Sequence, residues 1–531
     1  MTNLEHLDLS TNSFSGTLPY NIGSLIKLSF LSLRSNIFTG TLPLSLTQLS
    51  SLEETDCSDN MLSGSLPSSI GSLYNLLYFY AEDCLLSGFL PESITSMSSL
   101  VEFSVYRNTL SGPLPSALSL LTNVEYFDLG DNMFTGTLPS GVGSMTQLWL
   151  LYIDYSDLTG TLPTELGALD LLTDLSFYNN NLNGTLPSTL GGMTSLTYFD
   201  LGQNSFTGTL PASIINMSSL VFWYMDSSRI TGPLPFGFGD LSYLQQLSLF
   251  HNLLSGPLPE TITKLTVLDL LDLGANSISG SLPNDIGVLR RAEYISLAQN
   301  SLTGALPSTL SDLSNLKSLV LSFNHISGPI LPSIVDLTAL QRLDIGNNEI
   351  TGEFPSGITK IANLAILNGE SNALRGTIPS DIDILSALTF LALGNNYLNG
   401  TLPDSIANLY DPETGTGLYQ FRANSNLLTG SIPSSYANLS SLKELQLQDN
   451  LLITTYSDRF CELTRLETFY VTQSEYHECK IPTPMPTSVP TSLPSGNPTF
   501  VPTANPSELP THDPSSAPSH SPTVSPTSTP S

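Results

Sequence analysis

Charged residues are scarce in this chain, and bases are the scarcest. Only 12% of its 531 residues are charged, and 16 Lys and Arg face 46 Asp and Glu, which gives a formal net charge of −30. Such a surface repels nucleic acid and anionic lipid, and its salt-dependent field attracts cations. We therefore expect no nucleic-acid partner, and the acidity favours a cationic ligand.

Long apolar runs and catalytic motifs are also lacking. No run of 18 apolar residues occurs, so the sequence predicts no membrane span in this chain. There is no Gly-rich phosphate loop and no H-R-D or D-F-G set of a protein kinase. The six histidines are scattered, with neither metal-ligand spacing nor a triad arrangement. The sequence thus predicts no enzyme, no cofactor and no metal site.

What the chain does have is a repeat of 24 residues. The stretch 126–139 reads YFDLGDNMFTGTLP, and 198–211 reads YFDLGQNSFTGTLP. A fixed period of this size indicates a solenoid, whose coils bury their leucines only when stacked. One Asn per repeat keeps the register and, after a shift of six residues, resumes at Asn426 and Asn450. Before the shift it stands at Asn12, Asn36, Asn60, Asn108, Asn132, Asn180, Asn204, Asn252, Asn276, Asn300, Asn324, Asn348, Asn372 and Asn396.

Each unit reads roughly L-x-x-L-x-x-L-x-L-x-x-N-x-L-x-G-x-L-P-x-x-I-G-x. The central L-x-L alternates like a half-buried strand, so that Leu7 and Leu9 point inward while Asp8 points outward. The Asn that follows is expected to hydrogen-bond backbone groups of the turn and of the neighbouring coil. Gly-x-Leu-Pro then turns the chain, because Gly tolerates unusual dihedrals and Pro fixes its own.

The motif L-x-x-L-x-L-x-x-N-x-L-x-G-x-L-P is similar to the plant-type subclass of leucine-rich repeats. The resemblance covers residues 1–452 and about 19 repeats of 24 residues. It implies an α/β solenoid, a right-handed superhelix or horseshoe, with a parallel sheet on the concave side and short 3-10 segments on the convex side. It also implies receptor-like recognition of a protein, peptide or glycan, in the extracellular space or at the cell surface or wall.

The start of the chain departs from that family. No signal peptide is visible, and Met1 already lies inside the first repeat, without the Cys-bearing N-terminal cap that the family usually carries. A solenoid needs its apolar end covered. We therefore expect the signal peptide and cap to be missing from this sequence, and the alternative is an uncapped cytoplasmic solenoid.

A larger period of 72 residues begins near residue 52. The Asn is replaced in every third coil, by Cys84, Ser156 and Ser228. Outward strand positions nearby carry aromatic and acidic residues, and the Asp residues of the sheet are expected to be solvated. A cluster of exposed aromatics usually marks a contact surface. The predicted ligand-binding residues of the concave face are Tyr80, Glu82, Tyr106, Tyr152, Asp154, Tyr178, Tyr224, Asp226 and Phe250.

Two alternatives to a binding face remain open. The rows may be copied by recent duplication without selected function, or they form an ordinary solvated sheet. A structural role is the second possibility, because Thr-Gly-Thr recurs after the Asn, as at Thr135 and Thr137. Stacked coils would turn these residues into hydroxyl columns, as in a wall-associated or ice-binding protein, although Phe89, Pro113 and other residues interrupt the columns.

The C-terminal part is expected to differ from the solenoid. Residues 453–480 are predicted to form a cap, and residues 481–531, rich in Pro, Ser and Thr, a disordered tail. The insertion at 411–417 is expected to be a flexible loop. N-glycosylation sequons, compatible with secretion, stand at Asn183, Asn216, Asn399 and Asn438.

The four cysteines divide into two pairs. Cys461 and Cys479 flank the predicted cap, and closing that loop would stabilise it by roughly 3 kcal/mol in an oxidising compartment. Cys57 takes an inward strand position and Cys84 an Asn position, so both are expected to be buried free thiols.

We predict that Cys461 and Cys479 are disulfide-bonded in the secreted protein while the other two cysteines stay reduced. Thiol labelling of native and denatured protein, before and after reduction, measures this. Two thiols should react on denaturation alone, and two more only after reduction. A bridge between Cys57 and Cys84 would show that the predicted strand register is wrong.

Overall fold

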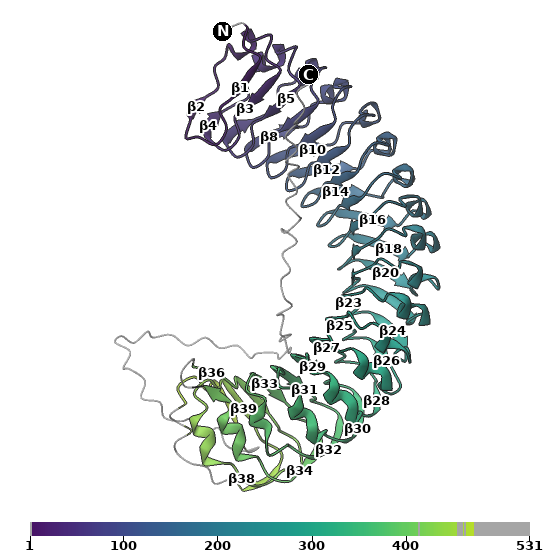
Figure 1. Ribbon diagram of the computed structural model, residues 1–531, viewed down its shortest axis with the longest axis vertical. Helices are drawn as coiled ribbons and strands as arrows, with labels where there is room; N and C mark the ends of the chain where they lie inside the picture. The colour runs from purple at the N-terminus through teal and green to yellow at the C-terminus, as the bar shows by residue number, and fades with distance from the viewer. Residues whose placement is uncertain (1–2, 412–414, 454–459, 461–462, 472–531) are drawn as a thin grey trace, which may run out of the picture. The chain divides into compact units, whose positions relative to one another are not determined.

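One parallel sheet of 20 strands lines the concave side of the stacked coils (Figure 1). A computed structural model describes residues 3–411, 415–453, 460 and 463–471. These belong to a compact unit, Met1–Cys479, and a second unit, Lys480–Ser531, lies outside the described residues together with Cys461 and Cys479. Each strand of the sheet pairs in parallel with its counterpart in the next coil, for example β1 with β3.

The strands of this concave sheet are β1 (His6–Asp8), β3 (Phe30–Ser32), β5 (Glu54–Asp56), β7 (Tyr78–Tyr80), β9 (Glu102–Ser104), β11 (Tyr126–Asp128), β13 (Leu150–Tyr152), β15 (Asp174–Ser176), β17 (Tyr198–Asp200), β19 (Phe222–Tyr224), β21 (Gln246–Ser248), β23 (Leu270–Asp272), β25 (Tyr294–Ser296), β27 (Ser318–Val320), β29 (Arg342–Asp344), β31 (Ile366–Asn368), β33 (Phe390–Ala392), β37 (Gln420–Arg422), β39 (Glu444–Gln446) and β41 (Thr468–Tyr470). The predicted solenoid is confirmed. Its last strand, β41, lies in the segment assigned to the cap, and the domain boundary itself stays a prediction.

A second parallel sheet, which the sequence pattern did not reveal, follows the Asn positions. Thirteen strands form its first part: β2 (Ser15–Thr17), β4 (Ile37–Gly40), β6 (Met61–Gly64), β8 (Leu85–Phe89), β10 (Thr109–Pro113), β12 (Met133–Thr137), β14 (Asp157–Gly160), β16 (Asn181–Thr185), β18 (Ser205–Thr209), β20 (Arg229–Gly232), β22 (Leu253–Pro257), β24 (Ser277–Gly280) and β26 (Ser301–Leu302). Two shorter sheets continue it, with β28 (Ser327–Pro329), β30 (Glu349–Glu353), β32 (Ala373–Thr377) and β34 (Tyr397–Asn399), and with β38 (Thr429–Ser431) and β40 (Leu451–Ile453).

The convex side carries single 3-10 turns, as expected. They are η1 (Ile22–Ser24), η2 (Leu44–Gln48), η3 (Ile70–Ser72), η4 (Glu92–Ser96), η5 (Leu118–Leu120), η6 (Ser140–Ser144), η7 (Thr164–Ala168), η8 (Ser188–Gly192), η9 (Ala212–Asn216), η10 (Phe238–Asp240), η11 (Glu260–Lys264), η12 (Ile286–Val288), η13 (Ser308–Asp312), η14 (Pro332–Asp336), η15 (Ser356–Lys360), η16 (Ile382–Ile384), η17 (Asp404–Asn408) and η18 (Ser434–Asn438). Many start after a Pro with φ near its fixed value, and Leu46 N–H donates to the Pro43 carbonyl to close such a turn. No helix in the described ranges has the length and apolar character that a bilayer crossing demands.

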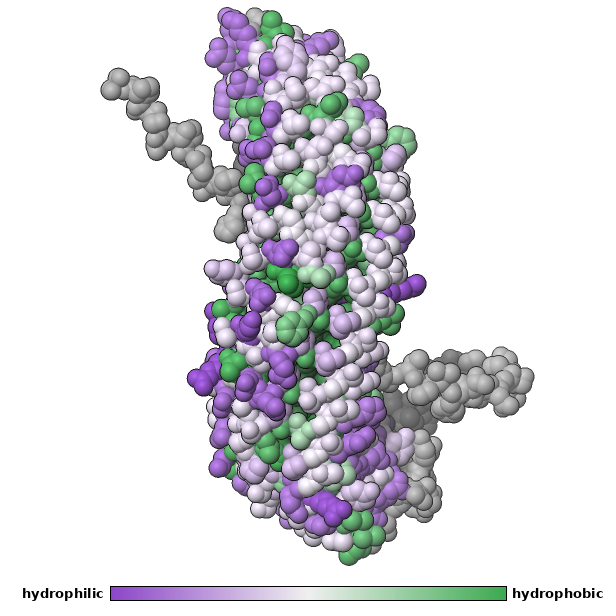
Figure 2. Space-filling model, turned by 90° about the vertical axis from the view of Figure 1, so that its right-hand side faces the viewer, coloured by the Kyte–Doolittle hydropathy of each residue, from purple (hydrophilic) through white to green (hydrophobic). Residues whose placement is uncertain are grey.

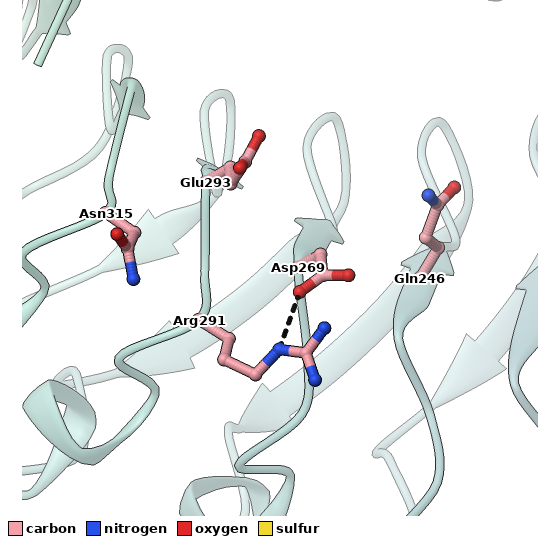
Figure 3. Close-up of a pocket in the computed structure, with 5 residues that line it drawn as sticks. All are labelled: Gln246, Asp269, Arg291, Glu293 and Asn315. Carbon is pink, nitrogen blue, oxygen red and sulfur yellow. Dashed lines mark ion pairs between the residues drawn. The ribbon is translucent and has the colours of Figure 1, made fainter. Parts of the chain in front are cut away.

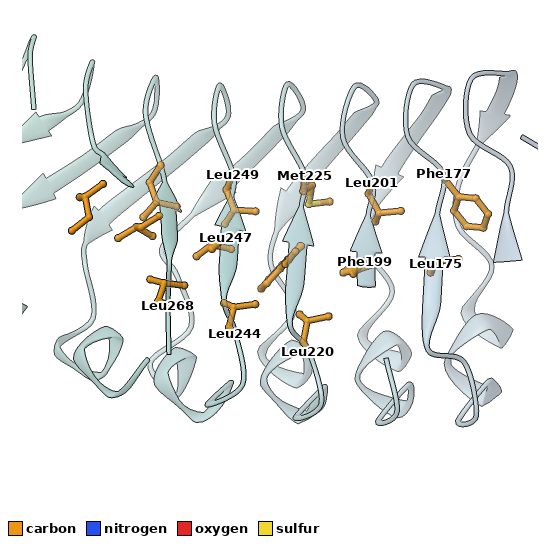
Figure 4. Close-up of a cluster of buried hydrophobic side chains, with 14 of the residues drawn as sticks. Leu175, Phe177, Phe199, Leu201, Leu220, Met225, Leu244, Leu247, Leu249 and Leu268 are labelled. Carbon is orange, nitrogen blue, oxygen red and sulfur yellow. The ribbon is translucent and has the colours of Figure 1, made fainter. Parts of the chain in front are cut away.

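The core is a set of columns that run through all coils. Leucines on either side of the strand centre repeat from coil to coil, with Phe177 and Met225 at equivalent positions (Figure 4). Stacked phenyl rings such as Phe79 and Phe103, 5.2 Å apart, replace leucines in part of the core. Seen from outside, apolar residues form separate spots among small polar ones rather than one broad patch (Figure 2).

The repeated Asn, which we call the ladder position, ties each coil to the preceding one. Asn132 Nδ2 donates to the carbonyls of Leu129 and Gly130 in its own coil, both at 3.0 Å. It also donates to Val105 of the preceding coil, and its Oδ1 accepts the Leu110 N–H, again both at 3.0 Å. The predicted role of the Asn is therefore confirmed. The residue before each ladder position has a left-handed φ in all nineteen described coils, which we number from Asn12 as coil 1.

Three coils lack the ladder Asn. In coils 7 and 10 the buried hydroxyls of Ser156 and Ser228 have no hydrogen-bond partner among the described residues. In coil 4 the Cys84 thiol donates to the Cys57 carbonyl at 3.4 Å. Both cysteines are buried and free, as predicted. The ladder thus has a weakened coil at every third position between coils 4 and 10.

Two expectations about loops and hydroxyls are wrong. The insertion before β37 forms an antiparallel hairpin, with β35 (Tyr410–Asp411) paired to β36 (Thr416–Gly417). In the second sheet neighbouring strands are offset, so that Thr137 pairs with Thr159 and not with Thr161. The Thr137 methyl fills the space above Gly160, where a Cβ would approach it to 2.8 Å. These threonines therefore serve packing between coils, which does not favour the hydroxyl-column alternative.

We predict that Asn132→Ser, which copies the natural weakening at Ser156, destabilises the solenoid by about 2–4 kcal/mol, because it leaves buried backbone groups unpaired. The reverse change, Ser156→Asn, should stabilise it by about 1 kcal/mol. Urea unfolding followed by circular dichroism measures both. An unchanged midpoint for Asn132→Ser would contradict the role given to the ladder.

Candidate ligand-binding face

Three outward positions in each coil build the concave surface. They lie six, four and two residues before the ladder position, and we call the resulting lines row A, row B and row C. The strand register aligns each row, since Asp128 pairs with Tyr152 and Asp200 with Tyr224. All nine predicted site residues lie in rows B and C of coils 4–11, and all are half-buried rather than exposed.

The predicted tyrosines of row B do not contact one another directly. Tyr80, Tyr152 and Tyr224 are three coils apart, about 15 Å for strands spaced about 5 Å. Tyr198 of row A, which sequence reasoning missed, fills the gap between two of them. Its ring centre lies 6.2 Å from that of Tyr152, 6.0 Å from that of Tyr224 and 6.4 Å from that of Phe222.

These four rings, Tyr152, Tyr198, Phe222 and Tyr224, form what we call the aromatic cluster. Tyr126 and Trp149, 5.4 Å apart, form a separate pair in earlier coils. The repeated YFD triplet contained the signal for row A, because its Tyr precedes the inward Phe just as the Asp follows it.

Hydrogen bonds hold the phenol groups of the row B tyrosines. Tyr80 donates to Glu102, Tyr152 donates to Asp174 Oδ1 at 3.5 Å, and Tyr224 donates to the amide oxygen of Gln246. Burial raises the pKa of Tyr224 to about 12, so that its hydroxyl stays neutral. The rings are therefore oriented before any ligand arrives, which lowers the entropic cost of binding.

The row B aspartates are buried, and the expectation that they are solvated is wrong. Asp128 is only 7% exposed and Asp200 4%. Asp128 Oδ1 accepts the N–H of Gly130 at 2.9 Å, and Asp200 accepts that of Gly202 at the same distance. The side chains of neighbouring coils cover these carboxyls, which satisfy backbone donors of their own strands.

Burial raises the pKa of these carboxyls, because the charged form loses water. The pKa rises to about 8 for Asp128, about 7 for Asp200 and about 6 for Asp272. The carboxyls of Asp154 and Glu82 raise that of Asp128 further, whereas the hydrogen bond from Gly130 opposes the shift.

Asp154 differs from its counterpart three coils later. Asp226 accepts hydrogen bonds from the Ser248 hydroxyl and from the Phe250 N–H, the latter at 2.9 Å. Asp154 lies over Gly130 instead, where a Cβ would come within 2.0 Å of its Oδ1. That oxygen is buried and has no hydrogen-bond partner in the described part of the chain. Burial raises the pKa of Asp154 to about 6.

The remaining predicted residues lie apart from the aromatic cluster. The Tyr178 ring covers Gly202 and meets Tyr155 edge-on at 5.2 Å, and Phe250 lies 5.9 Å from His251. Tyr106 has the Arg107 guanidinium 6.0 Å from its ring centre. In the described ranges no three acidic, His or Cys side chains converge as a metal ion would require.

The predicted glycosylation sequons all lie away from the concave rows. Asn183 and Asn399 are exposed in β16 and β34 of the second sheet. Asn216 and Asn438 are exposed at the ends of the convex turns η9 and η18. Their glycosylation stays a prediction.

Short parallel strands, an Asn ladder and one-turn convex helices define a leucine-rich-repeat solenoid. Leucine-rich-repeat family models match residues 290–350 and, in single repeats, residues 3–25, 51–73, 171–193, 195–217, 243–265 and 387–409. The chain is a leucine-rich-repeat protein. No curated protein sequence matches it.

Among solved structures, it resembles the ectodomains of plant receptors. The Arabidopsis receptor kinase HAESA with an IDA peptide is 29% identical over 89% of this chain and 82% of the receptor chain, with a TM-score of 0.78. The plant peptide hormone receptor RGFR1 with RGF2 is 28% identical over 88% and 82%, with a TM-score of 0.77. PEPR1 with AtPEP1 is 29% identical over 88% and 72%, with a TM-score of 0.76.

We predict that stability falls as the pH rises from about 4 to about 8. The folded pKa values of Asp128, Asp200 and Asp272 exceed 3.8, so the folded protein holds protons that the unfolded chain releases over this range. The stabilisation is complete below about pH 4 and is lost as the pH passes the folded values.

Asp128→Asn, which keeps an oxygen acceptor for Gly130, should remove part of this dependence and stabilise the protein at pH 8 by a few kcal/mol, on the order of 1.4 kcal/mol per unit of pKa shift. Urea unfolding between pH 4 and 8 measures it, with the exposed Asp170→Asn as the control. Equal pH profiles for wild type and Asp128→Asn would contradict the assignment.

Proposed function

We propose that this solenoid is a non-enzymatic recognition protein that binds a peptide or a segment of a protein across coils 4–11 of its concave face. The observation that carries the proposal is the aromatic cluster beside Asp154, whose buried carboxylate oxygen lacks a hydrogen-bond partner among the described residues. Pre-oriented aromatic rings supply contact area at low entropic cost, and such residues dominate binding energy at interfaces.

The resemblance to receptors supports a peptide over a glycan at this face. HAESA, RGFR1 and PEPR1 are described in complex with IDA, RGF2 and AtPEP1, the first two named as peptide hormone complexes. Their likeness extends over most of the solenoid, including all coils of the aromatic cluster's region. It also supports a location outside the cell or at its surface, and the sequons away from the concave rows fit that location.

The charge distribution favours a basic group in the ligand. A Lys or Arg side chain would give Asp154 Oδ1 the donor that it lacks, in a charge-assisted hydrogen bond. The same group would relieve repulsion between Asp154 and Asp128, which raises the pKa of Asp128. The net charge of −30 would steer such a ligand towards the solenoid in a salt-dependent way.

Selection from a random peptide library tests the proposal, followed by calorimetric titration of the enriched peptides. Enriched sequences should contain a basic residue next to an apolar one. Tyr152→Ala with Tyr224→Ala should weaken their binding by more than about 100-fold, and Asp154→Asn by about 10-fold or more. Phe236→Ala, at an 87% exposed aromatic on the convex side of coil 10, is the matched control and should bind normally.

Each variant must keep its urea midpoint near that of Phe236→Ala, so that lost binding is not lost folding. Undiminished binding in the Tyr152 and Tyr224 double variant would show that the peptide binds elsewhere. Enrichment of acidic peptides would contradict the role of Asp154.

A further inference from the structure

A polar pocket lies at the edge of the concave sheet, in coils 11–14, outside every residue predicted from the sequence. Its volume is about 400 Å³, and it is lined by Gln246, Asp269, Arg291, Glu293 and Asn315 (Figure 3). Gln246 begins β21, and the other four residues precede β23, β25 and β27 or their turns. The pocket therefore lies where the strands begin, whereas row C lies where they end.

Backbone hydrogen bonds fix the spacing of the pocket's acidic wall. Asp269 N–H donates to Gln245 at 2.7 Å, and Glu293 N–H donates to the Asp269 carbonyl at 2.8 Å. Lys317 N–H donates to the Glu293 carbonyl at 2.8 Å and continues the line. The two carboxylates thus come from rigid neighbouring coils, and a ligand would meet a formed site.

The charges in the pocket are already balanced. Arg291 reaches across to Asp269, with Nε 3.3 Å from Oδ1 (Figure 3). Lys317 Nζ lies 2.6 Å from Glu293 Oε2. This distinguishes the pocket from the environment of Asp154, since neither carboxylate lacks a cation beside it. A ligand with one strong charge would have to break an existing ion pair.

The lining also argues against an apolar ligand, because all five side chains end in a planar carboxylate, amide or guanidinium group. Such groups suit a neutral ligand that presents closely spaced donors and acceptors. Carboxylate and guanidinium groups can each hold two neighbouring hydroxyls at once, with matched donor and acceptor geometry. Tyr243, 65% exposed at the repeat position of Arg291 two coils earlier, offers a ring face on the same edge.

We propose that this pocket is a second binding site, for the hydroxyl groups of a carbohydrate chain. Asp269 and Glu293 accept sugar hydroxyls, while Arg291 and Asn315 donate to ring and hydroxyl oxygens. Gln246 separates the pocket from the aromatic cluster, since its amide oxygen accepts the Tyr224 hydroxyl. The two sites therefore adjoin but use different side chains, and the carbohydrate site does not depend on the proposed peptide ligand.

Titration of the full chain with neutral hexasaccharides tests this proposal. The probes are a β-1,3-linked glucose hexamer, a β-1,4-linked glucose hexamer and a β-1,4-linked mannose hexamer, followed by calorimetry or ligand-observed NMR. At least one should bind, and Asp269→Asn and Arg291→Gln should each weaken that binding by about tenfold or more. Lys264→Gln, which breaks a similar exposed ion pair of 3.3 Å with Asp240 outside the pocket, should leave it unchanged.

Asp154→Asn separates the two proposed sites, because it should lower peptide binding and leave the hexasaccharide titration unchanged. The carbohydrate proposal is wrong if none of the three hexamers binds, or if Asp269→Asn and Arg291→Gln bind the hexamer as wild type does. Loss of peptide binding in these two variants, with no hexamer bound, would instead make the pocket part of the peptide site.

Discussion

The side-chain amide of the ladder Asn is the interaction on which the rest of this solenoid depends. In coil 6, the Asn132 amide donates to its own turn and to the preceding coil, and its oxygen accepts a backbone N–H of that coil. The bonds fix each coil against its neighbour without a slip of register. Because the register is fixed, every outward residue becomes part of a row. The aromatic cluster and the polar pocket are both products of that alignment.

The fold followed from the sequence because its cause is local and repeated. The 24-residue period identified the strand, the Asn and the convex turn, since each needs only a few neighbouring residues. The second sheet was missed because its strands show no alternation and are paired with an offset, as at Thr137 and Thr159. Gly-x-Leu-Pro therefore looked like a turn alone. Its glycines do have left-handed φ, but in Gly160 this lies within a paired strand.

The site could be predicted only in part, because burial on a concave sheet depends on residues in other coils. Alternation predicted that Asp128 points outward, which is correct, and solvation was then assumed. The structure shows that side chains of adjoining coils cover it and that Gly130 donates to it. Row A was overlooked for a related reason. Tyr198 matters through its contacts with Tyr152 and Tyr224, which lie in different coils, and no single repeat reveals such contacts.

The weakened ladder coils are the same coils that carry an acid in row C. Cys84, Ser156 and Ser228 follow Glu82, Asp154 and Asp226 by two residues, so that loss of ladder bonds and outward acids were copied together. The strand geometry survives, since the intervening residues Tyr155 and Ser227 keep left-handed φ values of 47° and 55°. Each weakened coil also lies between coils with an intact Asn. In a stack whose stability is a sum over neighbouring coils, two intact coils can hold the register of a third. One coil in three is thereby free to carry residues that recognition requires and folding does not.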